Sequence, residues 1–228
     1  MLGILVELAL SWVIVWIAKK KNLNVLGLMP TWPRLRGFGI FFLVATFCCL
    51  LEIILRIACF KEHYSINPKL TLALFAEGLW WNIKSVLYEE LIFRGVLLYI
   101  LIRRLGAMKA IWISAIAFGV YHWFSFNLVG NVSAMIYVFI VTGIIGLLLA
   151  YSYAKILSLY IAIGFHLGWN FMRGFVFSQG PLGDGVFVVS KRAETTISYF
   201  TYYAVTIAPM VVTFLSSYFI LRKWKTVR

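Results

Sequence analysis

The chain has 228 residues, of which 63% are hydrophobic and only 13% charged, and its formal net charge is +13. Soluble domains are about half apolar and a quarter charged, so this composition excludes an ordinary soluble globule and predicts a polytopic membrane protein. The basic residues stand at the ends of apolar runs, where they anchor helices at a membrane surface. We therefore expect the lipid bilayer, and no nucleic acid, as a partner.

Seven apolar runs approach the length of about 20 residues that a helix needs to cross a bilayer. They are Leu2–Ala18, Phe38–Phe60, Lys84–Ile102, Ala107–Phe126, Val132–Ala154, Ile156–Phe171 and Tyr199–Leu221. The first lacks a basic segment before it and a small-residue cleavage site after it, so we expect a retained transmembrane helix. No long linker rich in Pro, Ser or Gly divides the chain, which predicts a single membrane domain over residues 1–228.

A shorter apolar stretch, Leu70–Ile83, precedes the third run. Joined to it, the stretch would make a helix of about 33 residues, or about 49 Å, which is too long for one ordinary crossing. We expect Leu70–Ile83 to lie at the membrane interface or to dip partway in, and an additional crossing is the alternative. The bundle would then have seven or eight transmembrane helices.

Basic residues follow the first, third, fifth and last runs, and with seven crossings all these ends face one side. The positive-inside rule makes that side cytoplasmic. The residues are Lys19, Lys20, Lys21, Arg34, Arg36, Arg103, Arg104, Lys109, Lys155, Arg222, Lys223, Lys225 and Arg228.

Several polar residues lie inside these runs, although an ionisable group at bilayer depth costs about 2.5 kcal/mol or more. Counted from the nearest basic residue of each run, at 1.5 Å per residue, a carboxylate, two histidines and an amide all stand about 16–23 Å above one membrane face. Groups at one height on three helices can form a single site, and these groups are the components of a hydrolytic centre. The polar residues are Glu89, Glu90, Arg94, His122, His166 and Asn170.

The two acids are expected to differ in role. Glu90 and Arg94 are four residues apart and can pair on one helix face. Glu89 is rotated from Glu90 by about 100° and can face a cavity, so Glu89 is the better candidate for a general base. The alternative is that both acids are structural counter-ions of Arg94 and Lys84.

Each histidine also has a structural alternative. His122 stands among aromatic residues and could belong to an interfacial belt. His166 and Asn170 are four residues apart and could donate hydrogen bonds to an oxyanion that develops on a peptide carbonyl. Their alternative is an interhelical hydrogen bond that stabilises the bundle.

A second charged pair, Glu52 and Arg56, lies within the second run. We interpret it as an internal structural ion pair, with Glu7 of the first run as a further partner. The chain has neither a Gly-x-Ser-x-Gly motif nor the His-Glu-x-x-His motif of common zinc proteases.

Three motifs follow one another on successive runs, and together they resemble the CPBP family of intramembrane proteases, related to the type II CAAX prenyl endopeptidases. That family is marked by Glu-Glu-x-x-x-Arg, Phe-x-x-x-His and His-x-x-x-Asn motifs in this order. The resemblance covers about Ser85 to Phe171. The motifs stand here as Glu89-Glu90-Leu91-Ile92-Phe93-Arg94, Phe118-Gly119-Val120-Tyr121-His122 and His166-Leu167-Gly168-Trp169-Asn170.

The resemblance implies an all-α fold, a polytopic membrane helical bundle. It also implies a multi-pass protein of the cell membrane that hydrolyses a peptide bond in a membrane-associated peptide or protein. It implies that Glu89 and His122 activate a water while His166 and Asn170 stabilise the oxyanion. Glu90, Arg94 and Phe118 would support the site, without a metal or other cofactor.

Three alternatives remain open. Glu89, His122 and His166 could hold zinc, although Asn170 is a poor zinc ligand and the sequence identifies no acceptors behind the histidines. The chain could be a catalytically silent scaffold or a bacteriocin-immunity factor on the same fold. A proton-coupled transporter would predict internal repeats, which the sequence does not show.

The resemblance also raises a question of sidedness. The charge rule places the polar layer nearer the outer face, whereas the eukaryotic CAAX enzymes cleave on the cytosolic side. Either the cavity opens inward through a funnel, or this protein handles other peptides.

Overall fold

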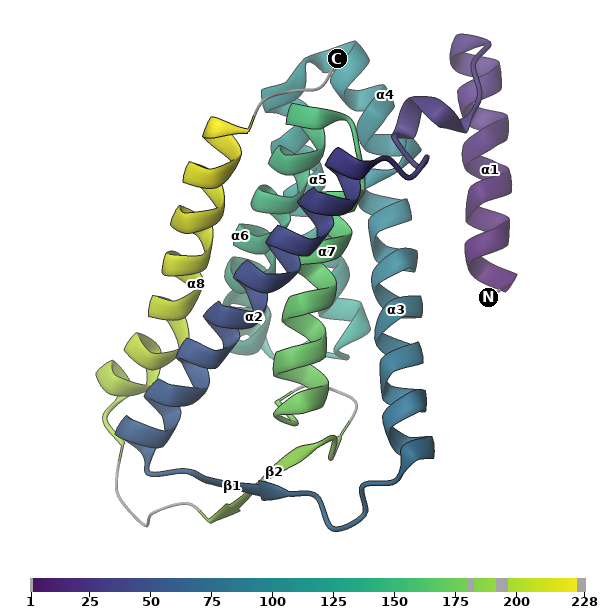
Figure 1. The fold of residues 1–228 in the computed structure, drawn as a ribbon. Coiled ribbons are helices and arrows are strands. Elements are labelled where there is room, and N and C mark those ends of the chain that lie inside the picture. Colours follow the sequence, from purple (N-terminus) through teal and green to yellow (C-terminus); the bar gives the residue numbers. More distant parts are fainter. Residues whose placement is uncertain (1, 180–182, 192–196, 225–228) are drawn as a thin grey trace.

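The computed structural model describes residues 2–179, 183–191 and 197–224, and these residues form a helical bundle with one small two-stranded sheet (Figure 1). The predicted fold class, an all-α helical membrane bundle, is confirmed. Among the described helices, α2, α6 and α8 are long and apolar enough to cross a membrane by length and composition. The elements are α1 Leu2–Lys19, η1 Leu23–Leu26, α2 Trp32–Phe60, β1 His63–Ile66, α3 Leu72–Arg94, α4 Val96–Leu105, α5 Ala107–Ser125, α6 Val132–Ile156, α7 Tyr160–Trp169, η2 Asn170–Val176, β2 Phe187–Lys191 and α8 Tyr199–Lys223.

The two ends of the bundle differ in the elements that meet there (Figure 1). At one end the chain leaves α1 and enters α2, turns from α4 into α5 and from α6 into α7, and leaves α8. We call this the basic end. At the other end β1 and β2 form an antiparallel pair beneath the helices, and we call it the strand end. Of the basic residues used above to assign the cytoplasmic side, Lys225 and Arg228 lie outside the described residues. The described basic-end side chains are Lys20, Lys21, Arg34, Arg36, Arg103, Arg104, Lys109, Lys155, Arg222 and Lys223.

The expectation of a separate interfacial segment at Leu70–Ile83 is wrong. Helix α3 begins after Thr71, whose hydroxyl caps its first turn, and continues without interruption through this segment. It ends at Gly95, where a Cβ would collide with the carbonyl oxygen of Leu91. The expected run Lys84–Ile102 is therefore divided between α3 and the short α4. At about 35 Å, α3 has the length of one crossing without a preceding interfacial helix.

Helices α2 and α7 approach each other closely because α7 carries two glycines on one face. A Cβ at Gly164 would collide with the carbonyl oxygen of Phe38, and a Cβ at Gly168 would lie 2.5 Å from that of Phe42. Small residues spaced by four permit such backbone contact between helices in a membrane. His166 lies midway between the glycines, about 200° around the helix, so the same packing turns it away from α2.

This packing predicts that Gly164→Ala destabilises the protein and lowers its activity. The added methyl group meets rigid backbone, and overpacking of this kind costs about 1–3 kcal/mol. Gly143→Ala on α6 is the matched control, because a Cβ there meets nothing within 4 Å. Thermal unfolding in detergent should show a lowered midpoint only for Gly164→Ala. Equal midpoints for the two variants would contradict the close approach of α2 and α7.

Candidate active site

The structure brings together three residues that the sequence placed at one height. The Oε2 atom of Glu89 on α3 lies 3.9 Å from Nε2 of His122 on α5 and 3.8 Å from Nε2 of His166 on α7. Their exposed fractions are 9%, 7% and 4%, respectively. His122 is therefore buried in the bundle and is not part of an exposed aromatic belt. The three motif-bearing helices thus converge on one point.

Behind this group lies the ion pair that the spacing of Glu90 and Arg94 predicts. Nη1 of Arg94 is 3.0 Å from Oε1 of Glu90, and both side chains are fully buried. Nη2 of Arg94 also donates to the carbonyl oxygen of Gly146 on α6, at 3.4 Å. The guanidinium carbon stands 4.1 Å from the centroid of the Phe118 ring, a cation–π contact. Glu90 and Arg94 thus connect α3 to α5 and α6.

The hydrogen bonds of the two histidines determine which ring nitrogens face Glu89. Nδ1 of His122 lies 2.7 Å from the carbonyl oxygen of Phe118, and Nδ1 of His166 lies 2.7 Å from Oε1 of Glu90. A carbonyl or carboxylate oxygen only accepts, so each Nδ1 carries a proton and donates it. In a neutral ring the Nε2 atom then has a free lone pair. Both Nε2 atoms face the Glu89 carboxylate.

Glu89 has one oxygen in contact with its own helix and one directed at the histidines. Oε1 accepts from the hydroxyl of Ser85 at 3.4 Å. Oε2 is buried and has no hydrogen-bond partner among the described residues. Its separations from the two Nε2 atoms exceed a direct hydrogen bond and match a bridge through one small polar ligand.

These groups line a cavity of about 540 Å³. Glu89 is part of its wall and Glu90 is not, as the 100° offset between them predicts. Asn170, one turn after His166, also lines it and begins the π-helix η2. The lining residues are Trp81, Asn82, Ser85, Glu89, Phe118, His122, Ser125, Phe126, Asn127, Val141, Thr142, Ile145, His166, Trp169, Asn170, Arg173, Gly174 and Gln179.

Sequence reasoning missed Arg173, a cation in the cavity wall. Its Nε lies 3.0 Å from Oε2 of Glu52 on α2, and its Nη1 donates to the carbonyl oxygen of Gln179 at 3.2 Å. Arg173 therefore holds η2 against α2 beside the cavity. The signal that could have found it is its position three residues after Asn170, just beyond the end of the motif-bearing run Ile156–Phe171.

The predicted ion pair of Glu52 and Arg56 is present, but the expectation of Glu7 as a further partner is wrong, because both carboxylate oxygens of Glu7 lack a hydrogen-bond partner among the described residues. Arg56 binds Glu62 through two hydrogen bonds of 2.9 Å, whereas its nearest approach to Glu52 is 3.9 Å. Glu7 lies on α1, which packs on α3 and α4. Tyr64 of β1 also donates to Glu62. Burial is the largest cause that raises the pKa of Tyr64 to about 12, and this hydrogen bond is the next largest. Glu62 lies after the end of α2, so the i,i+4 spacing could not reveal it.

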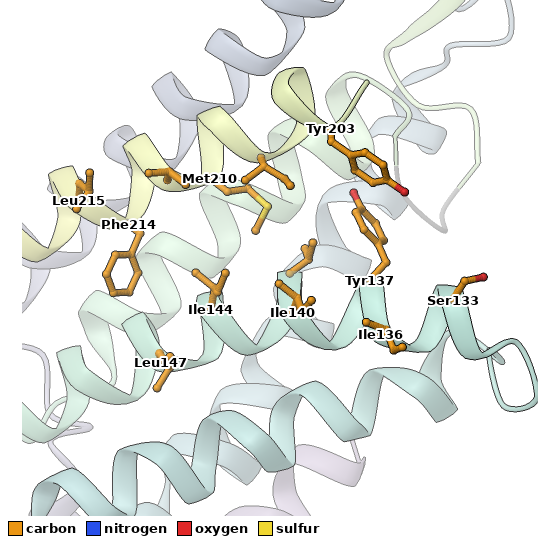
Figure 2. A pocket seen from close by; sticks show the side chains of 13 residues that line it. Ser133, Ile136, Tyr137, Ile140, Ile144, Leu147, Tyr203, Met210, Phe214 and Leu215 are labelled. Atoms are coloured by element: carbon orange, nitrogen blue, oxygen red, sulfur yellow. The ribbon is translucent and has the colours of Figure 1, made fainter. Parts of the chain in front are cut away.

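A second cavity, of about 600 Å³, lies between α6 and α8 (Figure 2). Its lining is apolar except for Ser133 and the hydroxyl groups of Tyr137 and Tyr203. None of the described residues that line it is an acid, a histidine or a cysteine. It therefore lacks the groups that activate a water.

A buried carboxylate facing two imidazoles, inside a bundle of apolar helices, is a candidate hydrolytic site of an integral membrane protein. A family model described as type II CAAX prenyl endopeptidase Rce1-like matches residues 40–172. The match covers more than half of the chain and includes all three motifs. The chain therefore belongs to this family of CAAX-type intramembrane proteases. Comparisons with curated proteins and with solved structures found no match.

Proposed function

We propose that the protein is a multi-pass endopeptidase of the cell membrane that hydrolyses a peptide bond in a membrane-associated peptide or protein. One observation carries the proposal. Oε2 of Glu89 faces Nε2 of His122 and of His166, at 3.9 and 3.8 Å, in the wall of a cavity. Two or three acceptors around one point are what a hydrolytic water needs for activation and orientation.

In this mechanism Glu89 and His122 share the attacking water. The water donates one hydrogen bond to Glu89 Oε2 and the other to His122 Nε2, whose lone pair is free because Nδ1 binds the Phe118 carbonyl oxygen. Glu89 takes the proton as the water attacks the peptide carbonyl, and the proton then passes to the leaving amine. Base catalysis of this kind contributes about 10²- to 10⁴-fold to the rate.

His166 and Asn170 stabilise the oxyanion in different ways. Because Nδ1 of His166 already donates to Glu90, its Nε2 donates only when the ring is an imidazolium. The side-chain amide of Asn170 supplies N–H donors whatever the protonation state of the histidines. Preorganised donors of this type are worth about 10²- to 10³-fold each.

Glu90, Arg94 and Phe118 position these groups. Glu90 holds the ring of His166, and Arg94 holds Glu90. Phe118 binds His122 through its backbone and lies with its ring against both histidine rings, at centroid distances of 4.5 and 5.9 Å. None of the three needs to touch the substrate.

The function is tested by single-turnover cleavage in detergent, with purified protein in excess over a panel of membrane-anchored peptides. Mass spectrometry should detect a cut at one peptide bond. The alternative scaffold or immunity role predicts no cleavage of any peptide and a cellular phenotype that survives replacement of Glu89.

One observation favours zinc as the alternative to a metal-free mechanism. Both histidines have the Nδ1 acceptors that zinc-bound histidines usually have, namely the Phe118 carbonyl oxygen and Glu90. The sequence could not identify these acceptors. However, the Nε2–Oε2 separations of 3.8 and 3.9 Å exceed the roughly 3.4 Å between ligands of tetrahedral zinc. Among the described residues, no group of three or more His, Cys, Asp or Glu is placed to hold a metal ion.

We therefore expect prolonged chelation to leave the hydrolytic activity intact. Elemental analysis of the treated, active protein should give zinc well below one ion per chain. If activity instead disappears with stoichiometric zinc and returns with it, the water is activated by a metal and the glutamate mechanism is wrong.

A further inference from the structure

The lining of the candidate active-site cavity extends from Glu89 toward one end of the bundle. Along α3 its lining runs from Glu89 back to Trp81, toward the start of the helix, and along α5 it runs forward to residues 125–127 at the end of the helix. Both directions lead to the strand end (Figure 1). Glu89 at the bottom of the cavity is buried, whereas residues 125–127 are exposed. The cavity therefore opens at the strand end.

Packed side chains close the opposite direction. Beyond Glu89, the fully buried pair Glu90–Arg94 spans from α3 to α6. A cluster of buried hydrophobic side chains then fills the bundle up to the basic end, and close-packed cores of this kind leave no channel for a peptide. Its members from α4, α5, α6 and the α6–α7 turn, each at most 6% exposed, are Val96, Leu98, Tyr99, Ala110, Ile111, Ala150, Tyr153 and Leu159. The structure thus has no inward funnel through the described residues.

The charges identify which membrane face each end meets. Among the described residues, the basic end carries ten Lys and Arg side chains, as defined above, and no acid. Within the described part of the chain, the strand end is balanced, with Lys61, Lys69 and Lys191 against Glu62, Glu77 and Asp184. Under the positive-inside rule the basic end is cytoplasmic and the strand end is not.

We infer that the candidate active site receives its peptide from the non-cytoplasmic side of the membrane. The substrate is then an exported peptide, or the outer segment of a membrane-anchored protein, and not a cytosolic tail. This inference deepens the proposed function and rests on it, because the protein has a peptide substrate only if it is an endopeptidase. It answers the question of sidedness, because the polar layer and the opening of its cavity lie toward the same face.

The second cavity, between α6 and α8, does not offer the peptide a lateral route to the candidate active site. It shares Val141 with the cavity wall, but its own lining is almost entirely hydrocarbon (Figure 2). A peptide backbone in the second cavity would leave its N–H and C=O groups unpaired, at a cost of several kcal/mol each. The open strand end, with Gln179 and Arg173 in the wall, provides polar partners instead.

The test labels single cysteines with a bulky, membrane-impermeant maleimide added to intact cells. Ser125→Cys reports on the mouth of the cavity, and Thr31→Cys, exposed at the start of α2, reports on the basic end. Both are made on a Cys59→Ala background, because Cys59 is exposed near the strand end while Cys48 and Cys49 are buried.

We expect Ser125→Cys to react in intact cells as completely as in permeabilised cells, and Thr31→Cys to react only after permeabilisation. The reverse pattern would overturn the orientation. A Ser125→Cys variant that stays unlabelled in permeabilised cells would overturn the opening. This measurement does not depend on catalysis.

The second arm uses the peptide that the purified protein cleaves, coupled to a charged dye that keeps it from crossing membranes. Right-side-out vesicles should cleave it and sealed inside-out vesicles should not. Cleavage by inside-out vesicles alone would overturn the inference. If the purified protein cleaves no peptide of the panel, the proposed function is refuted, and the expected labelling pattern would still leave the orientation intact.

Discussion

Replacing Glu89 by Gln is expected to abolish hydrolysis while the protein still folds and inserts. Glutamine has the same shape and keeps an oxygen for Ser85, which contacts Oε1 of Glu89 at 3.4 Å. Its amide cannot take a proton from a water, so the rate should fall by about 10²- to 10⁴-fold. The measurement is single-turnover cleavage by purified variant protein whose gel-filtration profile and melting curve match those of the wild type.

Two other acids on α3 serve as controls. Glu77→Gln alters an exposed carboxylate that does not line the cavity, and this variant should cleave at the wild-type rate. Glu90→Gln should lose activity chiefly because the folded protein becomes less stable. An active Glu89→Gln protein beside a well-folded but inactive Glu90→Gln protein would show that the two acids have been assigned the wrong way round.

The second large effect is a loss of stability of about 3–5 kcal/mol when Glu90 is replaced by Gln. Arg94 is fully buried and Glu90 is its only carboxylate within 4 Å among the described residues. The oxygen of the new amide could still accept from Nδ1 of His166, so the chief loss is the charge opposite Arg94. A buried guanidinium without its carboxylate partner is also not solvated by water, and such an unpaired buried charge is costly. Thermal unfolding in detergent and the yield of folded protein measure the effect.

The double variant Glu90→Gln/Arg94→Gln separates a stranded charge from general damage to the core. Removing both charges leaves no unpaired ion, so the double variant should be more stable than Glu90→Gln alone. If the double variant is no more stable than the single one, or if Glu90→Gln melts at the wild-type temperature, then this ion pair is not what holds the three helices together.

The candidate site could be predicted from sequence because its determinants are local and periodic. The spacing of Glu90 and Arg94 is that of neighbours on one helix face, and their 3.0 Å contact follows. The convergence of Glu89, His122 and His166 needed only the rise per residue of a helix and a basic anchor for each run. Both features follow from the sequence without knowledge of which helices pack together.

The features that sequence reasoning missed depend on tertiary structure. Glu52 and Arg173 are 121 residues apart in the chain, and no spacing rule connects them. The division of α3 from α4 depends on the conformation of Gly95, which hydrophobicity does not reveal. The pairing of β1 with β2, such as Tyr64 opposite Val189, joins two loops that carry no strong strand pattern.

The direction in which the cavity opens was equally beyond the sequence. Height above a membrane face places Glu89 in a layer but does not say which side of that layer is packed. The buried cluster around Leu98 and Tyr153 closes the basic end, and this follows only from how α4, α5 and α6 pack. Charge distribution then assigns the face, and that part was available from sequence.

The central claim is that Glu89 and His122 act on one water. A double-variant cycle tests it most directly, with single-turnover cleavage rates for Glu89→Gln, His122→Gln and the protein that carries both changes. Residues that act as a unit are strongly non-additive, so the double variant should lose little more activity than the more damaged single variant. Losses that multiply, or a fully active single variant, would show that the two residues do not share a reacting water.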